Sequence, residues 1–130
     1  MSRHMSAAIR ATLRRYYIAV WQNGDIAALD DLLTRDYVDH DPLPGFGADR
    51  TAAKTMAAHF TSAMPGARLE IHHLIVEGDL AAAHWSMTWK SGGQQHAPRS
   101  TAHAHMRGHD FFRVRDNRIC EIWHCEAILA

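Results

Sequence analysis

Cysteine, proline, net charge and long apolar segments are all scarce in this chain. Its 130 residues include two cysteines and four prolines, and 14 Lys and Arg balance 14 Asp and Glu. Cys120 and Cys125 lie an odd number of positions apart on one expected strand, so their side chains face opposite ways and we expect no disulfide. Neutral charge with scattered arginines predicts no nucleic-acid partner. No apolar segment reaches the roughly 20 residues of a membrane span.

The length and composition fit one globular domain. The chain is 47% hydrophobic and 22% charged, and its size allows one core with one ligand pocket. Residues 1–4 resemble a cloning scar ahead of Met5, so we assign 5–130 to a single domain. The chain opens without a secretory signal pattern, and we therefore expect a cytoplasmic protein.

Helices are expected in the first half of the chain. Apolar residues at helical spacing predict an amphipathic helix over roughly 6–23, which Gly24 can end. Asp25 can cap a short second helix, and Asp49 a third helix over 50–63. Tyr37-Val38 begin a short extended piece, and two prolines and two glycines within 41–47 predict a loop after it.

The second half changes to a period of two, which indicates strands. Two alternating stretches flank a turn at 77–79, and a polar loop follows at 91–98. The last two strands are expected at roughly 100–115 and 118–127. Helices followed by four long antiparallel strands predict an α+β fold, in which a cone-shaped, curved antiparallel sheet packs against three N-terminal helices.

The last expected hairpin contains the most informative pair of residues. Strands joined at Asp116-Asn117 place Asp110 opposite His124. A carboxylate beside an imidazole in an apolar pocket can support proton transfer. The alternative is a structural polar pair in the pocket wall.

Four short motifs, in this order, resemble the nuclear transport factor 2-like superfamily. They are Tyr17 with Asn23-Gly24-Asp25, then Tyr37-Val38-Asp39-His40-Asp41-Pro42, then Glu77-Gly78-Asp79, and finally Asp110-Phe111-Phe112-Arg113 followed by Ile119, Glu121 and Trp123. Within the superfamily the chain is most similar to SnoaL-type polyketide cyclases and steroid Δ5-3-ketoisomerases. Their fold hosts many chemistries and also inactive binding modules, so the resemblance does not specify the reaction.

The resemblance implies catalytic roles for five residues. Tyr17 corresponds to an oxyanion donor, Asp41 to the general base and Asp110 to a protonated acid that shares the oxyanion. His124 occupies the position of an acid/base aspartate in the cyclases, and His40 resembles the histidine of their His-x-Pro stretch. Adjacent extended residues face opposite sides, so His40 and Asp41 are alternatives for the pocket.

The role of Asp110 has two interpretations that exclude each other. As a neutral acid it would donate to an oxyanion, and as an anion it would pair with His124. We favour the anionic pair, because a nearby imidazolium lowers a carboxyl pKa. The base would then be His124 or Asp41.

The predicted ligand is a small, mostly apolar molecule. Candidate substrate-binding residues are Trp85, Met87, Trp89, Phe112, Phe60 and Trp21. We expect a cofactor-independent enzyme acting on a carbonyl or polyketide-like compound, by isomerisation, aldol cyclisation or dehydration. The alternative is a non-catalytic ligand-binding or dimerisation module. An epoxide hydrolase ranks third, because the last strands lack an Asp-Arg-Asp trio.

Eleven histidines raise the question of a metal. His103, His105 and His109 share a strand face, and His84 could add a ligand, but no carboxylate or cysteine lies at ligand spacing, so we predict no metal site.

In the resembling family such sheets pair back to back. The resemblance therefore implies a homodimer with a histidine-rich, pH-sensitive contact formed by the outward row His103, His105, Arg107, His109 and Phe111.

Overall fold

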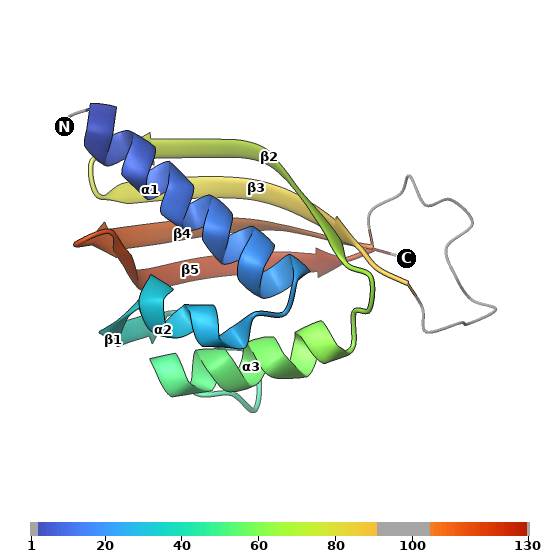
Figure 1. Ribbon diagram of the computed structural model, residues 1–130. Helices are drawn as coiled ribbons and strands as arrows, with labels where there is room; N and C mark the ends of the chain where they lie inside the picture. The colour runs from blue at the N-terminus through green and yellow to red at the C-terminus, as the bar shows by residue number, and fades with distance from the viewer. Residues whose placement is uncertain (1–2, 91–104, 130) are drawn as a thin grey trace.

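The computed structural model describes residues 3–90 and 105–129, drawn in colour in Figure 1. The elements in chain order are α1 (Arg3–Arg15), η1 (Tyr16–Gln22), η2 (Ile26–Ala28), α2 (Leu29–Leu32), β1 (Leu33–Asp39), α3 (Arg50–Ser62), β2 (Arg68–Glu77), β3 (Leu80–Thr88), β4 (Met106–Arg115) and β5 (Arg118–Ile128). The loop predicted at 91–98, the start of the strand predicted from 100, and His103 lie outside the described residues. None of the described helices is long and apolar enough to cross a membrane.

The first predicted helix consists of two helical segments. An α-helix runs to Arg15 and continues as the π-helical η1, and Gly24 follows with φ +73° in the left-handed region. In a π-helix each hydrogen bond spans five residues, so neighbouring side chains diverge less around the axis. Tyr16 and Tyr17 are accordingly both buried. Asp25 caps η2 and Asp49 caps α3, each accepting a backbone N–H, as predicted.

One five-stranded sheet forms the second layer, with strand order β1-β5-β4-β3-β2. The helices cover one of its faces, as Figure 1 shows. The α+β class and the four antiparallel strands are confirmed, but the sheet is not wholly antiparallel, because β1 adds to β5 in parallel. The sequence analysis expected only a short extended piece at Tyr37-Val38. A single strand with no partner nearby in sequence gives no hairpin signal, which is why this pairing was missed.

A bulge in β2 changes which of its side chains face the helices. The pairing with β3 shifts between Ile71 and His73. Beyond that shift Leu74 and Val76 pack against the core, whereas Ile75 is 61% exposed. The alternation expected through Ile75 is therefore wrong after Ile71, since an extra residue in one strand reverses its faces.

The β4–β5 hairpin has the predicted register. Asp110 lies opposite His124, and the turn residues Asp116 and Asn117 have φ of 52° and 60°. Two consecutive positive φ angles are typical of the type I′ turn that matches strand twist. Cys120 is buried and Cys125 exposed, and both are free.

Candidate active site

A cavity of about 430 Å³ lies between the helices and the sheet. Most of its wall is apolar, with seven aromatic side chains: Tyr16, Tyr17, Trp21, Tyr37, Phe60, Trp85 and Trp89. Its ionisable wall residues besides the tyrosines are Asp39, Asp110, His124 and Glu126. A second hollow of about 370 Å³ lies by the hairpin turns, but its acidic residues Asp79 and Asp116 are exposed. The larger cavity, with its buried ionisable side chains, is therefore the candidate active site.

Five of the six predicted substrate-binding residues line this cavity: Trp21, Phe60, Trp85, Met87 and Trp89. Phe112 does not, because it is fully buried behind the wall and packs edge-on against Tyr16 and Tyr17. Whether the five contact a substrate stays a prediction.

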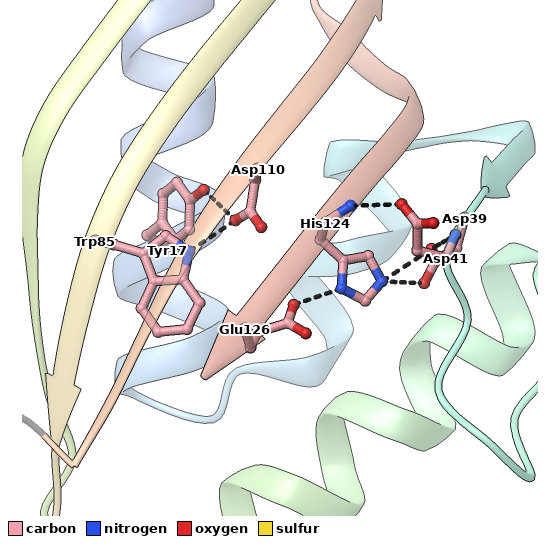
Figure 2. Close-up of polar contacts among 7 residues, drawn as sticks. All are labelled: Tyr17, Asp39, Asp41, Trp85, Asp110, His124 and Glu126. Atoms are coloured by element: carbon pink, nitrogen blue, oxygen red, sulfur yellow. Dashed lines mark hydrogen bonds and ion pairs between the residues drawn. The ribbon is translucent and has the colours of Figure 1, made fainter. Parts of the chain in front are cut away.

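Asp110 projects from β4 into the cavity wall and is only 5% exposed. Figure 2 shows that one carboxylate oxygen, Oδ2, accepts hydrogen bonds from the Tyr17 hydroxyl and from Trp85 Nε1, the latter at 2.9 Å. The other oxygen, Oδ1, has no hydrogen-bond partner within 3–90 and 105–129 and is not fully buried. Among these residues, hydrogen bonds thus hold only one of the two carboxylate oxygens.

Burial controls the protonation of Asp110. Loss of hydration raises the pKa of this carboxyl to about 7, against hydrogen bonds from Tyr17 and Trp85 that lower it. The negative charge of Glu126 raises it further, and His124 lowers it least of the named groups. At neutral pH the carboxyl therefore exists in both forms, which suits a group that takes up and returns a proton.

The Tyr17 hydroxyl is not available for a substrate oxygen, because it donates to Asp110. Tyr16 and Tyr37 also line the cavity, and in the described part of the chain neither hydroxyl donates a hydrogen bond, although that of Tyr16 accepts one from the Trp21 side chain. Burial raises the pKa of both phenols, so each keeps its proton at neutral pH. They replace Tyr17 as candidate oxyanion donors. Tyr16 precedes Tyr17 directly on the helix, and Tyr37 belongs to the second of the four motifs that carry the family resemblance.

His124 is held between two carboxylates and its side chain is 6% exposed. Its Nε2 lies 2.9 Å from both oxygens of Asp39, and its Nδ1 pairs with Glu126 (Figure 2). Burial alone lowers the pKa of this imidazole, but the hydrogen bonds and charges of Asp39 and Glu126 raise it to about 10. At neutral pH His124 is a cation that donates from both nitrogens, so it has no free nitrogen to act as a base.

The favoured anionic pair of Asp110 and His124 is therefore not what forms. The two residues are cross-strand neighbours, yet the polar partners of Asp110 are Tyr17 and Trp85, and those of His124 are Asp39 and Glu126. Burial of Asp110 also outweighs the attraction of the imidazolium for its charge.

His40 and Asp41 both lie outside the cavity, contrary to the expectation that one of them lines it. The His40 ring stacks on Trp123 with ring centres 4.5 Å apart and lies 2.8 Å from Glu121. Asp41 is exposed and accepts the backbone N–H of His124 at 2.9 Å.

The residues that sequence reasoning missed are Asp39 and Glu126. A period of two was the available signal for both. Asp39 lies two positions after the cavity residue Tyr37, and Glu126 lies two positions after His124. The contact of Asp39 with His124 depends on the parallel pairing of β1 with β5, which the sequence did not reveal.

Histidines gather on the outer face of the sheet. His84 lies with ring centres 5.0 Å from His72, 5.3 Å from His73 and 4.9 Å from His109. Desolvation and the positive charges of neighbouring groups lower the pKa of His84. In the described ranges no three His, Cys, Asp or Glu side chains are arranged to hold a metal ion. His105, predicted to join the outward row, is half-buried and packs edge-on against Trp89.

Comparison with known proteins identifies the class. Residues 13–122 match the SnoaL-like domain, so the chain belongs to the SnoaL-like family. A proposed polyketide cyclase from Bacillus cereus is similar in structure, with 25% identity and a TM-score of 0.82 over 97% of this chain and 78% of that one. A proposed polyketide cyclase from Acidithiobacillus ferrooxidans has 23% identity, a TM-score of 0.73 and coverage of 97% and 91%.

IdmH from Streptomyces antibioticus, another proposed polyketide cyclase, has 22% identity, a TM-score of 0.71 and 91% coverage of both chains. Because the Acidithiobacillus and Streptomyces structures are less than 25% identical to this chain, they support the fold alone. No curated protein matches the sequence. The family membership predicted from the four motifs is confirmed.

Proposed function

We propose that the protein is a cofactor-independent acid/base enzyme that acts on a small, mostly apolar carbonyl or polyketide-like compound. Isomerisation, aldol cyclisation and dehydration all begin with the same event, removal of a proton from a carbon next to a carbonyl group. The observation that supports this function is Asp110: a carboxyl in an aromatic cavity, with a pKa of about 7 and one oxygen that has no hydrogen-bond partner among the described residues. A general base is most effective when its pKa lies near the working pH.

In the proposed reaction, Oδ1 of ionised Asp110 takes the carbon-bound proton. The electron pair of the broken C–H bond forms the enolate double bond, and negative charge moves to the carbonyl oxygen. Tyr16 and Tyr37 are proposed to donate hydrogen bonds to that oxygen, because both phenols line the cavity and keep their protons. In isomerisation Asp110 then returns the proton to another carbon. In aldol cyclisation the enolate carbon attacks a second carbonyl, whose π bond breaks, and the resulting alkoxide takes the proton from Asp110. In dehydration the enolate electrons form a C=C bond while the β-hydroxyl takes the proton from Asp110 and leaves as water.

His124 is proposed to act through other groups and not by proton transfer. As a cation it holds Asp39 and Glu126 in place, and its charge favours the ionised form of Asp110. Asp41 is proposed as a positioning residue, because it contacts the backbone of His124 and not the cavity.

The pH dependence of proton exchange tests the proposed base. The probe is 2-tetralone, an apolar bicyclic ketone, and the measurement is the replacement of its α-protons by deuterium in D₂O, followed by NMR. The protein-dependent rate should rise with pH and level off, with a midpoint at about 7, because only ionised Asp110 accepts a proton. Binding of 2-tetralone without exchange would instead favour a non-catalytic ligand-binding module.

We also propose that the outer sheet face pairs with a second copy of the chain. No helix of the described residues covers it in Figure 1, and Ile75 and Phe111 are 61% and 56% exposed there. A carboxylate in place of Phe111 would bring like charges and unpaired polar groups into that contact. Sedimentation should give twice the 14.6 kDa of one chain for the wild-type protein at about pH 8, and a monomer for Phe111→Glu. A monomeric wild-type protein would contradict the dimer.

A further inference from the structure

The cavity has more negative than positive groups in its wall. Asp39, Asp110 and Glu126 are carboxyl groups, whereas among residues 3–90 and 105–129 His124 is the only basic residue of the lining, and no Lys or Arg of these ranges takes part in it. His124 pairs with both oxygens of Asp39 and with Oε1 of Glu126. The cavity therefore keeps an excess of negative charge even when His124 is a cation.

Two carboxylate oxygens in this wall have no hydrogen-bond donor among the residues described. They are Oδ1 of Asp110 and Oε2 of Glu126. Asp110 is only 5% exposed. Asp110 lies opposite His124 and Glu126 lies opposite Gly108, so the two carboxyl groups are diagonal cross-strand neighbours. An ionised carboxylate only accepts hydrogen bonds, so its partner must be water or a donor on a ligand.

The aromatic side chains add to the attraction for positive charge. Seven rings line the same cavity, and ring faces attract ammonium groups most strongly where water is excluded. Aromatic walls beside an unpartnered carboxylate are the usual means of binding an organic cation. A carboxylate ligand, by contrast, would meet like charges and no Lys or Arg from the part of the chain that the structure describes.

We propose that the cavity binds an aromatic or polycyclic molecule that carries an aliphatic ammonium group, which donates to Oε2 of Glu126, and that it excludes the corresponding carboxylates. If the proposed function is correct, this molecule is the substrate of the enzyme. The binding preference itself does not depend on that function. Oδ1 of Asp110 remains free for the reacting carbon. The carbonyl part of the molecule then lies against the aromatic wall beside Tyr16 and Tyr37.

Three indole compounds of nearly equal size test the proposal. They are tryptamine, a cation; tryptophol, which is neutral; and indole-3-acetate, an anion. The affinities are measured by titration calorimetry with the intact protein at about pH 8. The Kd for tryptamine should be at least about 10-fold below that for indole-3-acetate, and the Kd for tryptophol should lie between them. One screened charge interaction of about 1.4 kcal/mol corresponds to a factor of ten in Kd. Equal affinities, tighter binding of the anion, or no binding of tryptamine at millimolar concentration would each overturn the proposal.

Glu126→Gln locates the ammonium group. We expect this variant to reduce the preference for tryptamine about 10-fold. The matched control is Glu121→Gln, which removes the same charge from the same strand but from a residue outside the cavity wall, paired with His40 and Arg113. An unchanged preference in folded Glu126→Gln overturns the assignment to Glu126, and the wild-type ratio remains decisive if that variant fails to fold.

The outcomes separate this proposal from the proposed function. Preference for the cation without exchange of 2-tetralone would leave an amine-binding module and refute the enzyme. Exchange without preference for the cation would leave the enzyme and refute the substrate class.

Discussion

Replacing Asp110 with Asn is expected to lower the protein-dependent exchange of 2-tetralone by about 10²–10⁴-fold, the usual contribution of general acid/base catalysis. The amide has nearly the same shape, and its oxygen can still accept from Tyr17 and Trp85, as Oδ2 does now. It cannot take up a proton at neutral pH. The loss should appear in the rate of deuterium incorporation, while the circular dichroism spectrum and the unfolding midpoint show that the fold is kept.

Asp41→Asn is the matched control for that experiment. The family resemblance implies that Asp41 is the base, whereas the structure places it outside the cavity, bonded to the backbone N–H of His124. An amide oxygen can accept the same bond, so this variant should retain most of the exchange. Loss of exchange in Asp41→Asn with retention in Asp110→Asn would reverse the assignment and support the role implied by the resemblance.

Gly108→Ala is expected to destabilise the protein by about 3 kcal/mol, at the upper end of what overpacking in a core costs. Gly108 lies directly opposite Trp85 in the β3–β4 pair. An added Cβ would lie 2.3 Å from Cζ2 and 2.6 Å from Cε2 of the indole, far closer than two carbon atoms can approach. Trp85 is 6% exposed and lines the cavity, so its ring can move away from an added methyl group only into that cavity, at the cost of its own packing.

The same substitution should also disturb the site. A displaced indole loses its hydrogen bond to Asp110, and that bond is one of the interactions that lower the pKa of the carboxyl. The midpoint of the exchange profile should therefore move to higher pH. Urea unfolding gives the change in stability, and the pH series with 2-tetralone gives the change in midpoint.

Two controls isolate the clash between Gly108 and Trp85. Gly47→Ala adds a methyl group in a loop, where the nearest atom is the Cβ of Ala52 at 3.3 Å, and should cost much less. In a Trp85→Leu background the indole is gone, so Gly108→Ala should lose most of its effect and the double-mutant cycle should show strong coupling. Additive effects of the two substitutions would contradict the steric explanation.

The predicted elements that formed as expected are those with strong local signals. Gly24, Asp25 and Asp49 end or cap helices where predicted, and the Asp116-Asn117 turn gives β4 and β5 the expected register. The predictions that failed depended on one inserted residue or on a distant partner. The bulge in β2 reversed the strand faces after Ile71, and no local pattern marks where a bulge occurs.

The candidate site shows the same division. Its aromatic wall was largely predicted, because alternation places Trp85, Met87 and Trp89 on one strand face. The polar partners were not. His124 contacts Asp39, which is 85 residues away in the chain, only because β1 pairs in parallel with β5.

The sequence by itself determined the family, the α+β class, the hairpin that places Asp110 opposite His124 and most of the apolar lining, because periodicity, turn chemistry and motif order are local properties of the chain. Only the tertiary structure decided which carboxylates hold His124, that Tyr17 binds Asp110, and that His40 and Asp41 lie outside the cavity. It also decided the protonation of the site. A pKa depends on burial and on neighbouring charges in space, and neither exists until distant strands have packed together.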